Sequence, residues 1–203
     1  LVQEGNDVVC VTITSRHSGT YSTACTAAQP FGEHVTVIDS HAISMGTGYP
    51  VMEAAAMALD GAPKEAIVAR LHALRDRSHI MIHLESVEHV RAGGRLASVM
   101  PLVDRLARAM SLKTSLTMMD GELRLMGVAR STGKSLARIA HEVSTLGNLE
   151  KLIVIHVRAP EMAQRLVTLV EHLLPRSQDS VLVGEAGPVL ACHGGPGVVG
   201  VGA

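Results

Sequence analysis

The chain has 203 residues, of which 47% are hydrophobic and 18% are charged, and its formal net charge is −1 at pH 7. This length fits one large domain or two smaller ones, and the apolar fraction excludes an intrinsically disordered chain. The charge balance and the three aromatic residues, Phe31, Tyr21 and Tyr49, argue against a nucleic-acid partner. We therefore expect a core of aliphatic residues and methionines, which suits a flexible apolar ligand.

The cysteines and the apolar segments indicate a cytoplasmic protein. Cys10, Cys25 and Cys192 are odd in number and lack C-x-x-C spacing, as is typical of reduced cysteines. No apolar stretch approaches membrane-spanning length, so we expect no stable membrane insertion. The chain begins with LVQEGNDVV, which reads as the end of a helix leading into a strand. We therefore expect an N-terminal segment upstream of residue 1.

The first part of the chain predicts a parallel sheet covered by helices. Strand patterns at 7–15, 34–40 and 79–84 alternate with helical patterns at 16–29, 43–61 and 62–78. This order and spacing are typical of parallel α/β units.

After about residue 90 the pattern changes to helices mixed with hairpins. We expect helices at 86–92, 101–110, 134–146 and 160–174, and a strand at 150–157. Asp120-Gly121 joins two strands over 112–129, a strong hairpin signal. Residues 180–193 read as a second hairpin. Such a mixture predicts an α/β unit with a mixed or antiparallel sheet.

Two segments resemble functional motifs without meeting their geometry. GVARSTGKS (127–135) lies where a phosphate-binding P-loop would, but five residues separate Gly127 from Gly133 where the motif needs four. We therefore favour a turn entering a helix. His79 and His83 have the spacing of a helical zinc site, but they lie in a strand pattern, where four residues span about 13 Å. We expect no metal site there.

An acyl-hydrolase or acyltransferase is the alternative function, with Ser18, Asp39 and His193 as a triad. The G-x-S-x-G elbow of such enzymes is missing, because Arg16 and His17 precede Ser18.

Three other places offer groups that could bind an anion. TSRHSGTYS (14–22) puts hydroxyls and free N–H groups where a strand leads into a helix, although plain N-capping by Ser18 would explain the same pattern. Arg95 follows Gly93-Gly94 and is either a ligand for a carboxylate or phosphate or a solvated arginine after a helix end. His193 precedes a glycine-rich run and is either a ligand or a structural histidine.

In their order along the chain, these motifs resemble those of the DegV family of bacterial fatty-acid-binding proteins. The segments that carry the resemblance are ITSRHSGTY (13–21), VIDSHAISMGTG (37–48), LESVEHVRAGGRL (84–96), LKT (112–114), DGELRL (120–125), RSTGKS (130–135) and CHGGPG (192–197). The likeness covers essentially the whole chain.

The resemblance implies a two-lobed α/β fold, with a parallel-sheet lobe over 1–90 and a second α/β lobe over 91–203. A long-chain fatty acid would lie between the lobes, without any cofactor. Its carboxylate would be bound by the Ser-rich loop, including Gly19 and Thr20, and by ligands on the second lobe. The implied ligand residues are Thr14, Ser15, Ser18, Arg95 and His193. The protein would then be a lipid-binding subunit, not an enzyme, and would present the carboxylate to the catalytic subunit of a fatty acid kinase, which makes the acyl phosphate.

The sequence departs from the family pattern at several positions. Thr14 replaces a usual serine, Arg16 and His17 replace small or apolar residues, and Thr114 replaces the proline of an I-K-P motif. The N-terminal portion of the family pattern, with its own Asp-Ser and Thr-Ser-x-Pro-Ser motifs ahead of ITSRHSGTY, has no counterpart in residues 1–203. We expect the upstream segment to supply a strand, a helix and one hydroxyl ligand.

Overall fold

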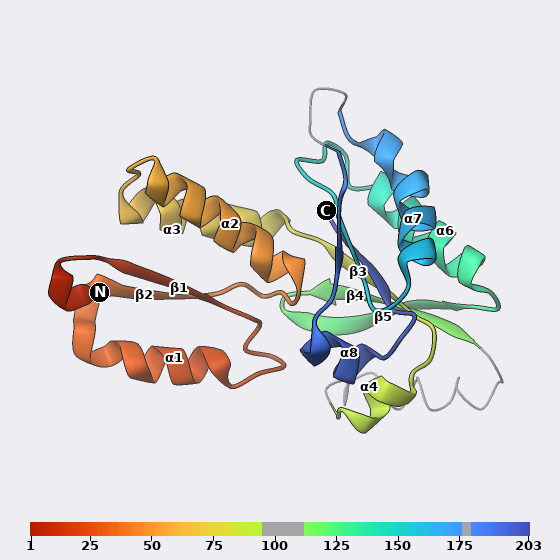
Figure 1. Cartoon of the computed structure of the whole chain (residues 1–203), viewed down its shortest axis with the longest axis horizontal. Helices are drawn as coiled ribbons and strands as arrows, with labels where there is room; N and C mark the ends of the chain where they lie inside the picture. Colours follow the sequence, from red (N-terminus) through yellow and green to blue (C-terminus); the bar gives the residue numbers. More distant parts are fainter. Residues whose placement is uncertain (95–111, 176–179) are drawn as a thin grey trace. The chain divides into compact units, whose positions relative to one another are not determined.

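The computed structural model describes residues 1–94, 112–175 and 180–203 (Figure 1). The chain divides into two compact units. Unit 1 consists of Leu1–Ser78 and Met119–Glu122, and unit 2 consists of His79–Met118 and Leu123–Ala203. The short piece Met119–Glu122 is the turn of a hairpin whose strands lie mostly in unit 2.

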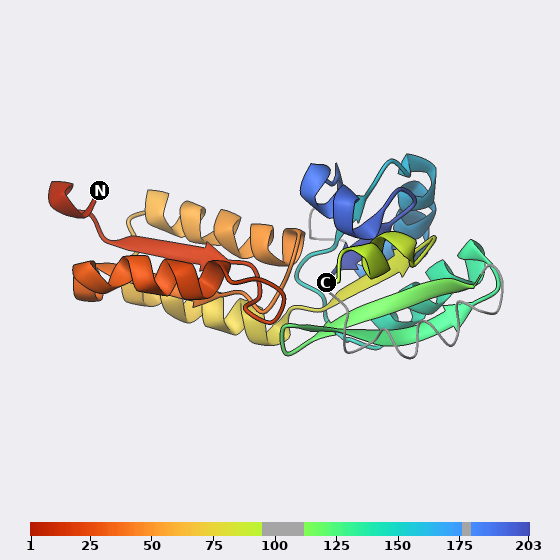
Figure 2. The ribbon, with the colours of Figure 1, turned by 90° about the horizontal axis from the view of Figure 1, so that it is seen from below.

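Unit 1 is built on two parallel strands, β1 (Val8–Thr12) and β2 (Val35–Asp39). Helix α1 (Thr20–Ala28) lies on one side of the pair, and α2 (Met45–Leu59) and α3 (Lys64–Arg77) lie on the other (Figures 1 and 2). Short 3₁₀ turns at Val2–Glu4 and Gln29–His34 precede the two strands. The core of this unit is formed by Ile38, Ile67 and Leu71.

Unit 2 contains a six-stranded sheet in the order β5-β4-β3-β8-β6-β7. Strand β6 runs parallel to β7, whereas β3 is antiparallel to both β4 and β8, so the sheet is mixed. Its strands are β3 (Ile80–Leu84), β4 (Lys113–Met119), β5 (Glu122–Ala129), β6 (Ile153–His156), β7 (Leu182–Glu185) and β8 (Val199–Gly202). The expected fold, a parallel sheet followed by a mixed sheet, is confirmed.

Helices cover both faces of this sheet. On one face, α6 (Thr132–Ser144) and α7 (Pro160–Val170) enclose the main core, which includes Ile139, Leu166 and Val199. A 3₁₀ turn, Glu171–Leu173, follows α7. On the other face, Val90 of α4 (Glu88–Ala92) clusters with Leu84 and Leu116. Helix α8 (Pro188–Gly194) packs against α4. No helix in the described part of the chain is both long and apolar enough to cross a membrane.

Two expected elements were wrong. The third strand does not continue the parallel sheet of unit 1, because β3 is hydrogen-bonded to β4 and β8 in unit 2. Residues 180–193 do not form a hairpin: after β7, Pro188 begins α8, and proline at the first helical position costs no hydrogen bond. The helix expected at 101–110 lies outside the described residues.

The other expected hairpin is confirmed. Strands β4 and β5 are neighbours in the sheet, and Asp120 and Gly121 join them with φ angles of +50° and +78°. Two positive φ angles in a two-residue loop match the twist of antiparallel strands, which is why Asp-Gly favours this turn.

Candidate functional site

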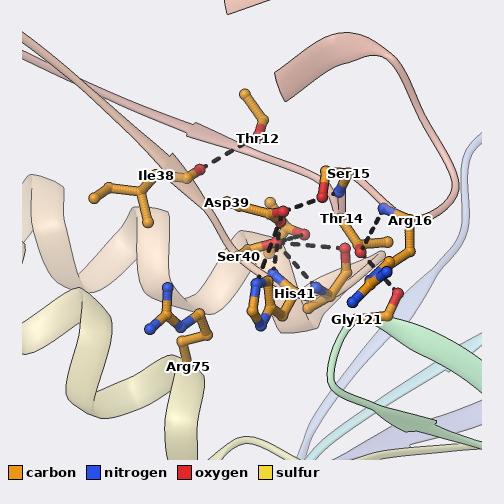
Figure 3. Close-up of polar contacts among 12 residues, drawn as sticks. Thr12, Thr14, Ser15, Arg16, Ile38, Asp39, Ser40, His41, Arg75 and Gly121 are labelled. Atoms are coloured by element: carbon orange, nitrogen blue, oxygen red, sulfur yellow. Dashed lines mark hydrogen bonds and ion pairs between the residues drawn. The ribbon is translucent and has the colours of Figure 1, made fainter. Parts of the chain in front are cut away.

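The Ser-rich loop between β1 and α1 is anchored by Thr14. Its side chain is fully buried, at 0% exposure. The hydroxyl donates to the carbonyl of Gly121 at 2.7 Å and accepts the N–H of Arg16 at 3.2 Å (Figure 3). The single hydroxyl proton of Thr14 is therefore used inside the protein.

Asp39, at the end of β2, anchors the same loop from the neighbouring strand. Its carboxylate accepts the N–H of Ser15 at 3.1 Å and the N–H of His41 at 3.0 Å (Figure 3). Burial alone would raise the pKa of Asp39, but hydrogen bonds from the hydroxyl and N–H of Ser15 and from the N–H of His41 hold it below its ordinary 3.8. Asp39 is thus an ionised acceptor that fixes the carboxyl ends of β1 and β2.

The rest of the loop presents hydroxyls at the start of α1. Ser18 Oγ lies 2.8 Å from Thr20 Oγ1 and accepts the N–H of Thr20 at 3.2 Å. The N-cap position itself is Gly19, so Ser18 caps the first N–H of α1 from the position before it. Two hydroxyls share one contact, so one proton of the pair remains available to an outside acceptor.

In unit 2, His193 lies in α8 against the end of α4. Its Nδ1 atom is buried and has no hydrogen-bond partner among the described residues. Buried polar atoms are nearly always paired, so such an atom calls for an explanation. Arg95, the other expected ligand from this part of the chain, lies outside the described residues.

Helices α4 and α8 contact each other through two histidine–glycine pairs. A β-carbon on Gly93, which follows α4, would lie 2.9 Å from Nδ1 of His193. Likewise, a β-carbon on Gly195, which follows α8, would lie 2.5 Å from Nδ1 of His89 in α4. Each helix therefore ends in a glycine that accommodates the histidine ring of the other, and Gly93, the first glycine of the pair before Arg95, has a packing role.

The structure thus gathers Thr14, Ser15, Ser18, Gly19 and Thr20 on one loop of unit 1, and places His193 in unit 2. The triad of the alternative function needs a hydrogen bond between Asp39 and His193. Among the described residues Nδ1 of His193 has no partner, and Asp39 is held by backbone N–H groups. These contacts do not support the triad.

The segment that resembles a P-loop is a helix start. Ser131 is the N-cap of α6, and its hydroxyl accepts the N–H of Lys134 at 3.4 Å. The expected turn entering a helix is confirmed. His83 lies within β3, as its pattern predicted, and within the described ranges no three histidine, cysteine or carboxylate side chains gather as a metal site would require.

Sequence reasoning missed the supporting roles of Asp39 and Gly121. Asp39 appeared only as a possible triad member and Gly121 only as a turn residue. An acidic residue at the carboxyl end of a parallel strand, beside a loop rich in hydroxyls, is the signal that could have indicated the first role. The second depends on a contact between positions 107 residues apart, for which the sequence carries no local signal.

Comparison with known proteins identifies the family of this chain. The family model described as "Uncharacterised protein, DegV family" matches residues 1–203. The chain belongs to the DegV family. A DegV domain-containing protein of Mycobacterium tuberculosis is 31% identical over 199 residues, which are 97% of this chain and 70% of that protein. A DegV domain-containing protein of Staphylococcus aureus is 28% identical over 99% of this chain and 71% of its own length.

Solved structures, among them DegV family proteins, share the fold. A fatty-acid-binding DegV protein from Thermus thermophilus superposes with a TM-score of 0.88 at 28% identity, over 99% of this chain and 71% of that one. A stearic-acid-binding protein from Eubacterium ventriosum has a TM-score of 0.83 at 25% identity, over 99% of this chain and 71% of that one. The DegV protein Cg2579 from Corynebacterium glutamicum has a TM-score of 0.88 at 26% identity, over 98% of this chain and 75% of that one.

Proposed function

We propose that this protein binds a long-chain fatty acid. The observation that carries the proposal is the likeness to the fatty-acid-binding DegV protein of Thermus thermophilus over 99% of this chain. The aliphatic, aromatic-poor composition suits a flexible acyl chain better than a flat, stacked ligand.

We propose that the carboxylate is bound by Ser18, Thr20, Arg95 and His193. A carboxylate taken out of water needs several donors, because an unpaired buried charge is costly. The Ser18–Thr20 pair has one uncommitted hydroxyl proton, and Nδ1 of His193 lacks a partner among the described residues. Arg95 would add the planar fork of a guanidinium, which matches a carboxylate.

Thr14 and Ser15 have a different part in this proposal. The hydroxyl of Thr14 donates its proton to the Gly121 carbonyl, and the N–H of Ser15 donates to the Asp39 carboxylate. A hydroxyl has only one proton to donate. We therefore propose that these two residues hold the loop in shape, while Gly19 and the residues beside it face the ligand.

The binding proposal is tested by what copurifies with the protein. Organic extraction of the full chain purified from a bacterial host should release a long-chain fatty acid in near one-to-one amount, and native mass spectrometry should show the same mass difference. Recovery of no lipid, or of a nucleotide, would contradict the proposal. Covalent labelling of a serine by a fluorophosphonate probe would instead favour the acyl-hydrolase.

We further propose that the bound acid is the substrate of a separate kinase, so that this chain is a cytoplasmic carrier subunit and not itself an enzyme. In the partner, a carboxylate oxygen would attack the γ-phosphorus of ATP and release ADP, leaving an acyl phosphate. The test adds ATP and a candidate kinase subunit to the loaded protein and traps acyl phosphate as the hydroxamate. Product formed without the kinase would overturn the carrier role.

A further inference from the structure

A cluster of polar side chains in unit 2 lies outside the proposed ligand set and centres on Glu85. Glu85 directly follows β3. Its carboxylate forms an ion pair with Lys113 of β4 and accepts the hydroxyl of Thr132 in α6 at 3.1 Å. It also contacts Nε2 of His83 at 3.2 Å. One carboxylate therefore joins three elements of the unit.

Glu85 is the acceptor in each of its side-chain hydrogen bonds in this cluster. Burial alone would raise the pKa of Glu85, but hydrogen bonds from Lys113, His83 and Thr132 hold it below its ordinary 4.5, so Glu85 is an ionised acceptor. Burial lowers the pKa of His83, whose ring is neutral and has one N–H to give. Because Glu85 can only accept, Nε2 of His83 donates to it and Nδ1 accepts from Ser135 at 2.8 Å.

The far end of the chain of hydrogen bonds is closed off from solvent. Ser135 Oγ lies 2.8 Å from Ser115 Oγ, and His83, Ser115 and Ser135 are all 0% exposed. A substrate cannot reach these hydroxyls, so the serine–histidine–glutamate sequence is not a nucleophilic site in this structure. These four residues can therefore influence the protein surface only through Glu85, whose side chain is 36% exposed.

Glu85 contacts the glycine segment that follows His193. A β-carbon on Gly197 would lie 2.8 Å from Cβ and 3.1 Å from Cγ of Glu85, so the loop after His193 rests on this side chain. Gly197 has a φ of +81°, and its N–H donates to the Val157 carbonyl at 2.9 Å. On the other side, Glu85 stands three positions before α4, the helix that ends at Gly93 against the His193 ring.

We propose that Glu85, held by Lys113 and Thr132, is a positioning residue that fixes the His193 ring between the end of α4 and the Gly195–Gly197 segment. The proposal rests on the proposed function, because His193 matters only if it binds the fatty-acid carboxylate. The side chain of Lys113 also donates to the backbone carbonyl of Glu85 at 3.4 Å, so the start of the α4 segment is held through main chain as well as side chain.

The test uses Glu85→Gln in the full chain, because glutamine offers one acceptor oxygen to three donors and lacks the charge that pairs with Lys113. Fatty-acid dissociation constants should rise by about tenfold in the parent and by less than about twofold in a His193→Ala background. Equal losses in both backgrounds would show that Glu85 does not act through His193, and would overturn the proposal. Lys113→Met and Thr132→Val should weaken binding in the same His193-dependent way, and they replace Glu85→Gln if that variant does not fold.

A second readout needs no ligand. The ring resonance of His193, assigned by its loss in His193→Ala, should shift in Glu85→Gln and Lys113→Met. A matched control is Val143→Ala, which removes methyl groups from a side chain with 0% exposure in the main core and should lower stability without moving this resonance. If the parent binds no fatty acid, the proposed function fails, whereas an unchanged ring resonance in both cluster variants overturns the positioning role.

Discussion

The hydroxyl of Thr14 donates a 2.7 Å hydrogen bond to the carbonyl of Gly121, a residue 107 positions further along the chain. The contact joins the Ser-rich loop after β1 to the turn between β4 and β5, and both residues belong to unit 1. Gly121 is itself buried, so its carbonyl has little access to water. The loop that carries the proposed ligands Ser18 and Thr20 is therefore held at its base by a hairpin turn.

Replacing Thr14 by valine keeps the shape of the side chain and removes the hydroxyl. Because the Gly121 carbonyl and the Arg16 N–H both lose a partner, we expect a loss of about 1–3 kcal/mol in the free energy of unfolding, measured by urea denaturation. The matched control is Thr168→Val, whose hydroxyl is exposed and donates to the carbonyl of Gln164 in its own helix, and which should change stability by no more than about 0.5 kcal/mol. Equal effects of the two substitutions would contradict this role of Thr14.

Gly121→Ala should lower the free energy of unfolding for two separable reasons. The φ of +78° is strained for any L-residue with a β-carbon, and that carbon would lie 2.6 Å from the Thr14 hydroxyl oxygen. Gly61 has the same φ of +78° and no neighbouring atom within 4 Å, so Gly61→Ala carries the strain alone. We expect Gly121→Ala to cost about 1–3 kcal/mol more than Gly61→Ala in urea unfolding. A difference near zero would mean that the turn can move away from the loop.

Acidification should destabilise the protein through His83. Burial holds the pKa of His83 below its ordinary 6.5 in the folded state, so the unfolded chain takes up this proton first. The contribution to stability is complete above about pH 6.5 and is lost as the pH falls toward the folded pKa. His83→Gln should reduce the slope of the free energy of unfolding against pH by up to about 1.4 kcal/mol per pH unit, measured by urea unfolding between about pH 7.5 and 5. The same slope in both proteins would rule His83 out as the cause.

Arg95 and His193 should act as one unit in fatty-acid binding. If both bind one carboxylate, removing either should cost about 2–5 kcal/mol, and the two losses should not add. Arg95→Lys should be nearly as harmful as Arg95→Ala, because an ammonium cannot reproduce the guanidinium fork. The measurement is a double-mutant cycle on dissociation constants, with circular dichroism to verify folding. Lys134→Ala is the control and should bind like the parent, since Lys134 lies in the first turn of α6 and outside the proposed ligand set. Normal binding by both Arg95→Ala and His193→Ala would refute the assignment.

Features encoded by neighbouring residues were predictable from the sequence. Asp120-Gly121 predicted its hairpin because both positions need positive φ angles, and the segment 127–135 predicted a turn entering a helix, which the structure has at the start of α6. The two strands of unit 1 were predicted from the strand patterns at 7–15 and 34–40. In each case a short segment contains the whole physical reason for its structure.

Features that depend on distant partners were not predictable. The pattern of β3 shows a buried strand, but not that its neighbours are β4 and β8. Helix α8 has seven residues, too few for a helical period to show, so its apolar residues read as a strand. The positions of Glu85 and Lys113 at strand ends fit solvated charges equally well, and their ion pair appears only once β3 and β4 are paired.

The chain passes from one unit to the other three times, after Ser78, after Met118 and after Glu122. A fragment that ends at Ser78 would contain Thr14 without the carbonyl to which it donates. The shortest continuous stretch with both partners runs from 14 to 121 and takes in β3 and β4 of the other unit. Unit 1 therefore packs as one body but does not correspond to one continuous stretch of the chain. To express it alone, the Asp120-Gly121 turn would have to be joined back onto it.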